Sequence, residues 1–174
     1  MSDAPPDRIR LRPYHPGYLL AYLALGEAGH PRPAMQYGVR LLRSCRPDTQ
    51  VELVREYDDI CLHCERLETD PEGSVWGSGH SCPSSRDAEV VAEVHRENDA
   101  ILTALDSAYG AAFRADALFP LLAERLGELA HLPMQGSAVI QENCRAGLEK
   151  LQAKWHGEGR GPRGSRLLRP RLRR

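Results

Sequence analysis

The segment from Asp58 to Pro83 constrains the fold of this chain most, because its composition suits neither a helix nor a regular strand. It contains three cysteines, Cys61, Cys64 and Cys82, and the run between the last two is rich in Gly, Ser and Pro. A segment with so little apolar content gains order more readily from a bound metal than from packing. The sequence therefore indicates a metal or cluster site, and it says less about a reaction.

The spacing of these cysteines is that of a metal-binding motif. Two residues separate Cys61 from Cys64, so a tight turn directs both sulfur atoms to one point, and Cys82 can bring a third thiolate. Zinc would take the three thiolates and His80 in a tetrahedral site. An iron–sulfur cluster would take the three thiolates and one further ligand. A metal-free loop with incidental thiols is the third possibility.

Two short motifs resemble those of a known family. Leu11 to His15 reads Leu-Arg-Pro-Tyr-His, and Asp58 to Cys64 reads Asp-Asp-Ile-Cys-Leu-His-Cys. They are similar to the Leu-Arg-Pro-His-His and Asp-Asp-Ile-Cys-x-x-Cys motifs of domain-of-unknown-function family 1284, bacterial and archaeal proteins presumed to bind iron–sulfur clusters. The resemblance covers most of residues 9–150. It implies an iron–sulfur cluster, most readily a 4Fe-4S cluster.

The resemblance also implies a ligand set. Cys82 matches a third family cysteine, and Cys144 falls where the family has a C-terminal cysteine cluster. Two positions depart from the family: Tyr18 lies near an expected cysteine, and Gly147 stands roughly where a second C-terminal cysteine is expected. The implied ligands are therefore Cys61, Cys64, Cys82 and Cys144, enough for one four-cysteine cluster.

Other residues compete for roles beside this centre. His15 could be a fourth ligand or a proton donor, or it could simply form hydrogen bonds at a helix start. Asp58 and Asp59 could turn the chain before Cys61, and Asp59 could act as a general base beside an open iron. Cys45 lies at the far end of the strand that precedes Cys61, which favours a buried helical thiol over a ligand.

The hydrophobic pattern predicts a mainly helical α+β domain with a short strand and a cysteine-bearing loop packed among the helices. Val51 and Leu53 alternate with polar residues, as in a half-buried strand. Apolar residues recur at helical spacing in five further segments. The expected helices span residues 17–28, 34–45, roughly 85–109, a stretch around Pro120, and 137–155.

Composition divides the chain into a disordered N-terminus over residues 1–8, a metal-binding domain over 9–155 and a basic tail over 156–174. The tail carries seven arginines and one glutamate, while the whole chain has a net charge of −1, so the body is acidic. The tail has no aromatic residues to stack on bases, which argues against a nucleic-acid partner. No apolar run reaches the length of a membrane span, and the N-terminus lacks a signal-peptide pattern. We therefore expect a cytoplasmic protein, in which thiols stay reduced.

Two functional classes follow from these patterns. The first is an iron–sulfur protein whose cluster transfers electrons to a redox partner protein or acts on a small-molecule substrate at an open iron. The second is a zinc-stabilised interaction module without catalysis, with His80 as a ligand.

Overall fold

The computed structural model describes residues 5–26, 32–64, 68–69, 80–81, 88–132, 136 and 138–158. In these ranges it is a mainly helical α+β domain, as the sequence predicts. Cys82, one of the predicted ligands, lies outside the described residues.

A three-stranded sheet joins distant parts of the chain. Strand β1 (Arg8–Leu11) pairs in parallel with β2 (Gln50–Leu53), which pairs antiparallel with β5 (Ala112–Arg114). In β1 and β2, Ile9, Leu11, Val51 and Leu53 point to the core and their polar neighbours do not. The alternation in β2 confirms the predicted strand, whereas β5 was not predicted.

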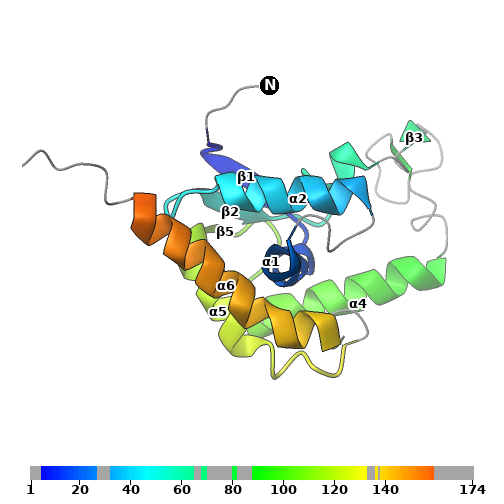
Figure 1. The fold of residues 1–174 in the computed structure, drawn as a ribbon. Coiled ribbons are helices and arrows are strands. Elements are labelled where there is room, and N and C mark those ends of the chain that lie inside the picture. Colours follow the sequence, from blue (N-terminus) through cyan, green and yellow to red (C-terminus); the bar gives the residue numbers. More distant parts are fainter. Residues whose placement is uncertain are drawn as a thin grey trace, which may run out of the picture.

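The helices pack around α1 (His15–Leu25). Figure 1 shows α1 nearly end-on in the centre, with α2 (Pro33–Ser44) above it and α6 (Ala138–Glu158) passing in front. The other two long helices are α4 (Ala88–Ala104) and α5 (Ala115–Arg125), which contains Pro120. Proline at the first turn of both α1 and α2 fits their starts, because the missing N–H is not needed there.

Several helix boundaries differ from the expected ones. Helix α1 begins at His15, two residues before the expected start, and α6 runs to Glu158, past the expected boundary at residue 155. Helix α4 ends at Ala104 instead of near Tyr109, and Asp106 and Gly110 adopt positive φ angles of 49° and 86° in the turns that lead to β5. Left-handed residues of this kind end a helix, and asparagine, aspartate and glycine tolerate them best.

Helices α1 and α6 cross at very close range. A Cβ atom at Gly147 of α6 would overlap the carbonyl oxygen of Leu20 in α1. Beyond this crossing, Trp155 donates its indole N–H to the carbonyl of Cys45 at 2.9 Å, and Lys150 donates to the carbonyl of Ala24. Helix α6 therefore satisfies carbonyl groups at the ends of both α1 and α2, which lack partners within their own helices.

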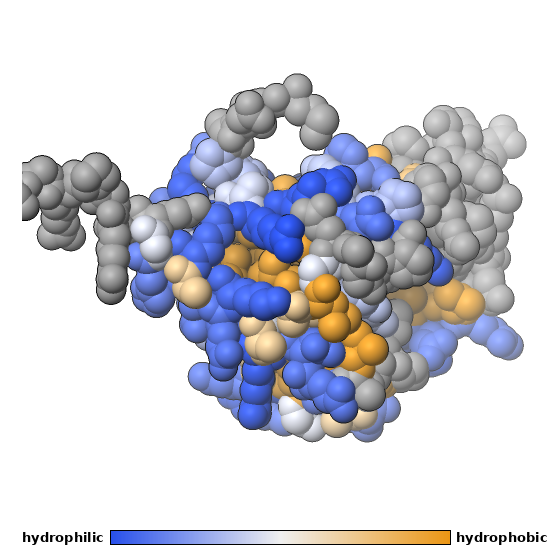
Figure 2. Space-filling model, in the orientation of Figure 1, coloured by the Kyte–Doolittle hydropathy of each residue, from blue (hydrophilic) through white to orange (hydrophobic). Residues whose placement is uncertain are grey.

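The surface is mostly hydrophilic on the face drawn in Figure 2, with an apolar area in the middle, where α1 and α6 lie in Figure 1. Leu25, the last residue of α1, keeps 47% of its surface exposed. No helix in the described ranges is both long and apolar enough to traverse a bilayer.

Candidate metal centre at a buried aspartate

The sheet brings the two sequence motifs together. Because β1 and β2 are parallel, their carboxyl ends meet at one edge of the sheet. The chain that leaves β1 carries Arg12 and His15, and the chain that leaves β2 carries Asp58 and Cys61. The contact continues past the strands, where the amide of Asp59 donates to the carbonyl of Arg10 at 3.1 Å.

Asp58 is the centre of this contact. Its side chain is completely buried, and both carboxylate oxygens accept hydrogen bonds. Oδ1 accepts the amides of Ile60 at 3.1 Å and Cys61 at 2.9 Å. Oδ2 accepts the amide of Arg12 at 2.8 Å and pairs with Nδ1 of His15. One carboxylate therefore fixes the cysteine turn, the chain after β1 and the first residue of α1.

The surroundings of Asp58 keep it ionised. Burial alone would raise the pKa of the carboxyl group, but the positive charge and hydrogen bond of His15 oppose that effect. The amide and the guanidinium of Arg12 act in the same direction, and the resulting pKa lies well below the usual range. Asp58 is thus a buried carboxylate at neutral pH.

His15 is held by this carboxylate and is itself 95% buried. Its ring lies 4.2 Å from that of Tyr14, centroid to centroid, with a tilt of 50°. Nδ1 pairs with Asp58, and within the described ranges no hydrogen-bond partner is found for Nε2. In the neutral tautomer with its proton on Nδ1, Nε2 carries a lone pair that can bind a metal or accept a proton, whereas in the charged ring both nitrogens are donors.

Cys61 and Cys64 lie on a short 3-10 turn, η2 (Cys61–His63), in which the amide of Cys64 donates to the carbonyl of Cys61 at 2.9 Å. Neither cysteine forms a disulfide, and both residues are partly exposed. Burial and the negative charge of Asp58 raise the pKa of Cys61, while Arg12 opposes the rise. Ile60, the residue before this turn, is buried and packs close to Gly38 of α2.

His63 and Asp59 have other surroundings. His63 is exposed and stacks on Tyr37 of α2 with a centroid separation of 3.7 Å, so it points away from the core. The Oδ2 atom of Asp59 accepts the Arg10 amide at 2.8 Å, and burial raises its pKa, an effect that this hydrogen bond opposes. The turn-forming role predicted for at least one of the two aspartates is confirmed for Asp58.

The two other described cysteines, Cys45 and Cys144, are buried among the helices. Cys45 is buried, and its thiol donates to the carbonyl of Leu41 at 3.3 Å. Cys144 is buried in α6, and the chain around it packs on α1. Within the described ranges no three His, Cys, Asp or Glu side chains converge as a metal-binding group. The ligand role of Cys144 therefore stays a prediction.

A short ladder spans the segment between the second and third cysteines. Strand β3 (Glu68–Thr69) pairs antiparallel with β4 (His80–Ser81), with Glu68 opposite Ser81 and Thr69 opposite His80. Glu68 comes four residues after Cys64, and Ser81 immediately precedes Cys82 in the chain. The ladder was not predicted, because strands of two residues carry no periodic signal.

Two further buried residues escaped prediction from the sequence. Arg12 donates from Nε to the carbonyl of Glu56 at 3.0 Å, and its guanidinium lies 5.2 Å from the ring centroid of Tyr57. Asn98 in α4 accepts the Tyr14 amide at 3.2 Å. Asn98 follows Val91 by seven residues and precedes Ile101 by three, so a polar residue on the apolar face of this helix was the available signal.

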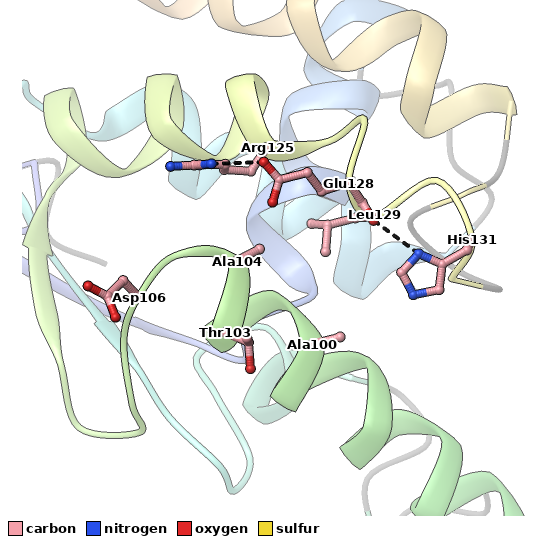
Figure 3. A pocket seen from close by; sticks show the side chains of 8 residues that line it. All are labelled: Ala100, Thr103, Ala104, Asp106, Arg125, Glu128, Leu129 and His131. Carbon is pink, nitrogen blue, oxygen red and sulfur yellow. Dashed lines mark hydrogen bonds and ion pairs between the residues drawn. The ribbon is translucent and has the colours of Figure 1, made fainter.

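A surface groove lies elsewhere on the molecule, between the ends of α4 and α5. Figure 3 shows Thr103 and Asp106 on one side of the groove and Glu128 on the other. The carboxylate of Glu128 accepts a hydrogen bond from the guanidinium of Arg125 at 2.8 Å. His131 completes the wall and bonds through Nδ1 with the carbonyl of Glu128 at 3.0 Å. The lining residues include none of Arg12, His15, Asp58 and Cys61, so this groove is separate from the candidate centre.

Comparison with known proteins yields no assignment, since no family model, no curated protein and no solved structure matches this chain.

Proposed function

We propose that this chain binds an iron–sulfur cluster, most readily a 4Fe-4S cluster, through thiolates that include Cys61, Cys64 and Cys82. The observation that carries the proposal is the attachment of the cysteine turn to Asp58. A carboxylate that accepts the Cys61 amide holds the turn in place before any metal arrives, and preorganised ligands bind more tightly.

The donor set fits a cluster or a zinc ion in its chemistry. The described residues offer two partly exposed cysteines on one turn, and soft thiolates suit both iron–sulfur clusters and zinc. The β3–β4 ladder returns the chain toward the start of the segment immediately before Cys82. Burial and the charge of Asp58 raise the pKa of Cys61, and the guanidinium of Arg12 opposes part of this rise, so a bound metal would have to displace the thiol proton.

A bound cluster would supply either electron transfer or a Lewis-acidic iron. For electron transfer the chain needs only to bind the cluster and limit its contact with water, and the partner is a redox protein. For substrate chemistry, His15 and Asp59 are the groups that could move a proton beside the centre, and the partner is a small molecule. The reduced cytoplasm is the compartment we propose, because thiolate ligands must remain unoxidised there.

Anaerobic purification tests the proposal directly. The full chain should be brown and contain iron and acid-labile sulfide. Cys61→Ala, Cys64→Ala and Cys82→Ala should each lose most of the iron, while Cys45→Ala, which changes a thiol of the helical core, serves as the matched control. Full iron content in all three turn and loop variants would contradict the proposal.

Zinc is the second candidate, and the position of His80 favours it. His80 lies on β4 two residues before Cys82, so a three-cysteine, one-histidine site is compatible with the chain path. A colourless protein that contains one zinc per chain and no sulfide would establish this alternative. In that case the protein is an interaction module, and its zinc stabilises the segment that carries the ligands.

A further inference from the structure

We propose that Cys61 and Cys64 form a reversible disulfide in the metal-free chain, by exchange with a low-molecular-weight disulfide. The proposal goes beyond the proposed function, because it concerns the chain without metal and holds whether or not a metal binds. It makes the cysteine turn a redox modification site. In the structure both cysteines are reduced.

The spacing of the two cysteines on η2 matches the geometry of a disulfide. The amide of Cys64 donates to the carbonyl of Cys61 at 2.9 Å, which is the hydrogen bond of a 3-10 turn. Such a turn has three residues and rises about 2 Å per residue, so residues i and i+3 lie on the same side about 6 Å apart. Disulfides join cysteines whose Cα atoms are about 4.4–6.8 Å apart. A bond between the two sulfur atoms therefore needs no large movement of the backbone.

Backbone hydrogen bonds hold the turn in this conformation. Oδ1 of Asp58 accepts the amides of Ile60 at 3.1 Å and Cys61 at 2.9 Å, and the carbonyl of Asp58 accepts the Leu62 amide at 3.1 Å. The amide of His63 donates to the carbonyl of Ile60 at 3.1 Å. The second thiol is thus held near the first before any bond forms between them. This preorganisation favours one internal disulfide over two separate mixed disulfides.

A small disulfide can reach the turn, whereas it cannot reach the other described cysteines. Cys61 and Cys64 are partly exposed, and Leu62, which lies between them in the chain, keeps 52% of its surface exposed. Cys45 and Cys144 are completely buried in the helical core. Because exchange requires a thiolate to attack the disulfide directly, access confines the reaction to the turn within the described ranges.

The exchange proceeds in two steps. One thiolate of the turn attacks a sulfur atom of the small disulfide, forms a mixed disulfide and releases one small thiol. The second thiolate attacks the protein sulfur of the mixed disulfide, which closes the bond between Cys61 and Cys64 and releases the second small thiol. The two thiol protons end on the released small thiols. The chain therefore loses two protons and two electrons, and the small disulfide gains them.

Oxidation of the turn has a consequence for metal binding, and this consequence, unlike the disulfide itself, rests on the proposed function. The ligand of a metal is the thiolate, and neither sulfur of a disulfide is a thiolate. Oxidation would therefore remove Cys61 and Cys64 from the proposed ligand set and block metal loading. Reduction by a small thiol would restore both ligands.

Oxidised glutathione added to the metal-free full chain under anaerobic conditions provides the test. The remaining thiols are blocked with iodoacetamide in urea, and a tryptic digest is read without reduction by mass spectrometry. Trypsin places both turn cysteines in one peptide, residues 56–66, and Cys82 in the next. We expect this peptide to be unalkylated and lighter than its reduced form by the mass of two hydrogen atoms. Excess dithiothreitol should restore two alkylatable thiols.

Three kinds of variant serve as controls. Cys61→Ser and Cys64→Ser should each carry glutathione on the remaining cysteine, while Cys45→Ser should oxidise as the wild type does. The double variant with His63→Cys and Cys64→Ser keeps two thiols but moves the second to position i+2, off the shared side of the turn. It should form mixed disulfides in place of the internal bond. Circular dichroism of each reduced variant confirms that it is folded.

The contrary results are distinct. Two alkylated cysteines in peptide 56–66, or glutathione on both, would overturn the proposal. A disulfide that joins Cys82 to either turn cysteine in most chains would also overturn it, and so would an internal disulfide that forms equally well in the double variant. A wild type that forms the disulfide but takes up no iron or zinc when reduced would contradict the proposed function and support this proposal.

Discussion

At the scale of single residues, Asp58 combines complete burial with four polar contacts in the described structure. Its carboxylate accepts the amides of Arg12, Ile60 and Cys61 and pairs with His15. Asn in its place would present an NH₂ group to some of these donors and remove the charge that His15 faces. We expect Asp58→Asn to lower the free energy of unfolding by about 3–5 kcal/mol, the range for breaking a buried ion pair.

Urea unfolding of the metal-free protein measures this effect, and Asp59→Asn is the matched control. Asp59 is the adjacent carboxylate, it is only partly buried, and it accepts one amide, that of Arg10. We expect a loss of about 1 kcal/mol for Asp59→Asn. Equal losses in the two variants would show that Asp58 is not the principal anchor of the turn.

The Cys45 thiol provides a prediction of pH dependence. Burial raises its pKa to about 12, although Lys154 opposes the rise. A folded-state pKa above the unfolded value means that the thiol's contribution to stability is complete below about pH 9 and is lost as the pH rises toward 12. In that window the unfolding free energy should fall by about 1.4 kcal/mol per pH unit from this group alone.

Cys45→Ser isolates this contribution, because serine keeps a donor for the carbonyl of Leu41 and does not titrate in this range. The slope of unfolding free energy against pH, measured between pH 9 and 11, should be shallower in Cys45→Ser than in the wild type. Parallel slopes would mean that the thiol already ionises in the folded protein.

At the scale of elements, the crossing of α1 and α6 is the tightest contact in the described structure that a single substitution can test. Gly147→Ala would place a methyl group on the carbonyl oxygen of Leu20, and the two helices would have to separate. We expect a loss of about 2–4 kcal/mol in thermal or urea unfolding, because backbone cannot move aside as a side chain can. Gly157→Ala, in the same helix with no atom near the added methyl, should change stability by less than about 1 kcal/mol.

The same crossing bears on the family resemblance. A cysteine at position 147 would meet the Leu20 carbonyl, so a chain with that cysteine must pack its last helix differently. Gly147→Cys should therefore be as destabilising as Gly147→Ala and should not add a metal ligand.

The elements also show what the sequence could and could not predict. The periodic apolar residues of α2, α4 and α6 predicted these helices to within a few residues, because one face of each is buried. The three-residue strand β5 was missed, since its pairing with β2 is set by a partner more than fifty residues away. Local pattern carries no information on such a partner.

At the scale of the whole molecule, the four cysteines in the described ranges differ in their surroundings. Cys45 and Cys144 are buried in the helical core, whereas Cys61 and Cys64 are partly exposed on the turn. We expect iodoacetamide at pH 8 to label Cys64 in the native metal-free protein and Cys61 more slowly, because burial and Asp58 raise the pKa of Cys61. Cys45 and Cys144 should stay unlabelled, as read by peptide mass spectrometry. Reconstitution with iron and sulfide should then protect the turn cysteines.

Two outcomes would contradict this prediction. Labelling of Cys144 in the native protein would mean that α6 opens from α1 readily. Unchanged labelling of Cys61 and Cys64 after reconstitution would separate the turn from the metal. Urea-denatured protein, in which all cysteines should be labelled, is the control for reactivity.

The candidate site was predicted in part for a physical reason. Cysteine spacing is a local property, so the sequence identified Cys61 and Cys64, and a histidine before a helix start made His15 a candidate. The pairing of His15 with Asp58 could not be predicted, because it joins residues that only the β1–β2 register brings together. Arg12 lies in the Leu-Arg-Pro-Tyr-His motif, but that motif assigned it no role, and Asn98 belongs to no motif, so only their burial and contacts reveal them.

The parallel pairing of β1 and β2 has a consequence for how the site assembles. Every bond between Asp58 and the chain after β1 closes a loop of more than forty residues, so none of them can form until α1 and α2 have folded back and the strands are in register. A nascent or unfolded chain has the two turn cysteines without the buried carboxylate that orders them. If the proposed centre forms, metal would therefore bind the native chain more tightly than the unfolded one, and loading would favour correctly folded chains.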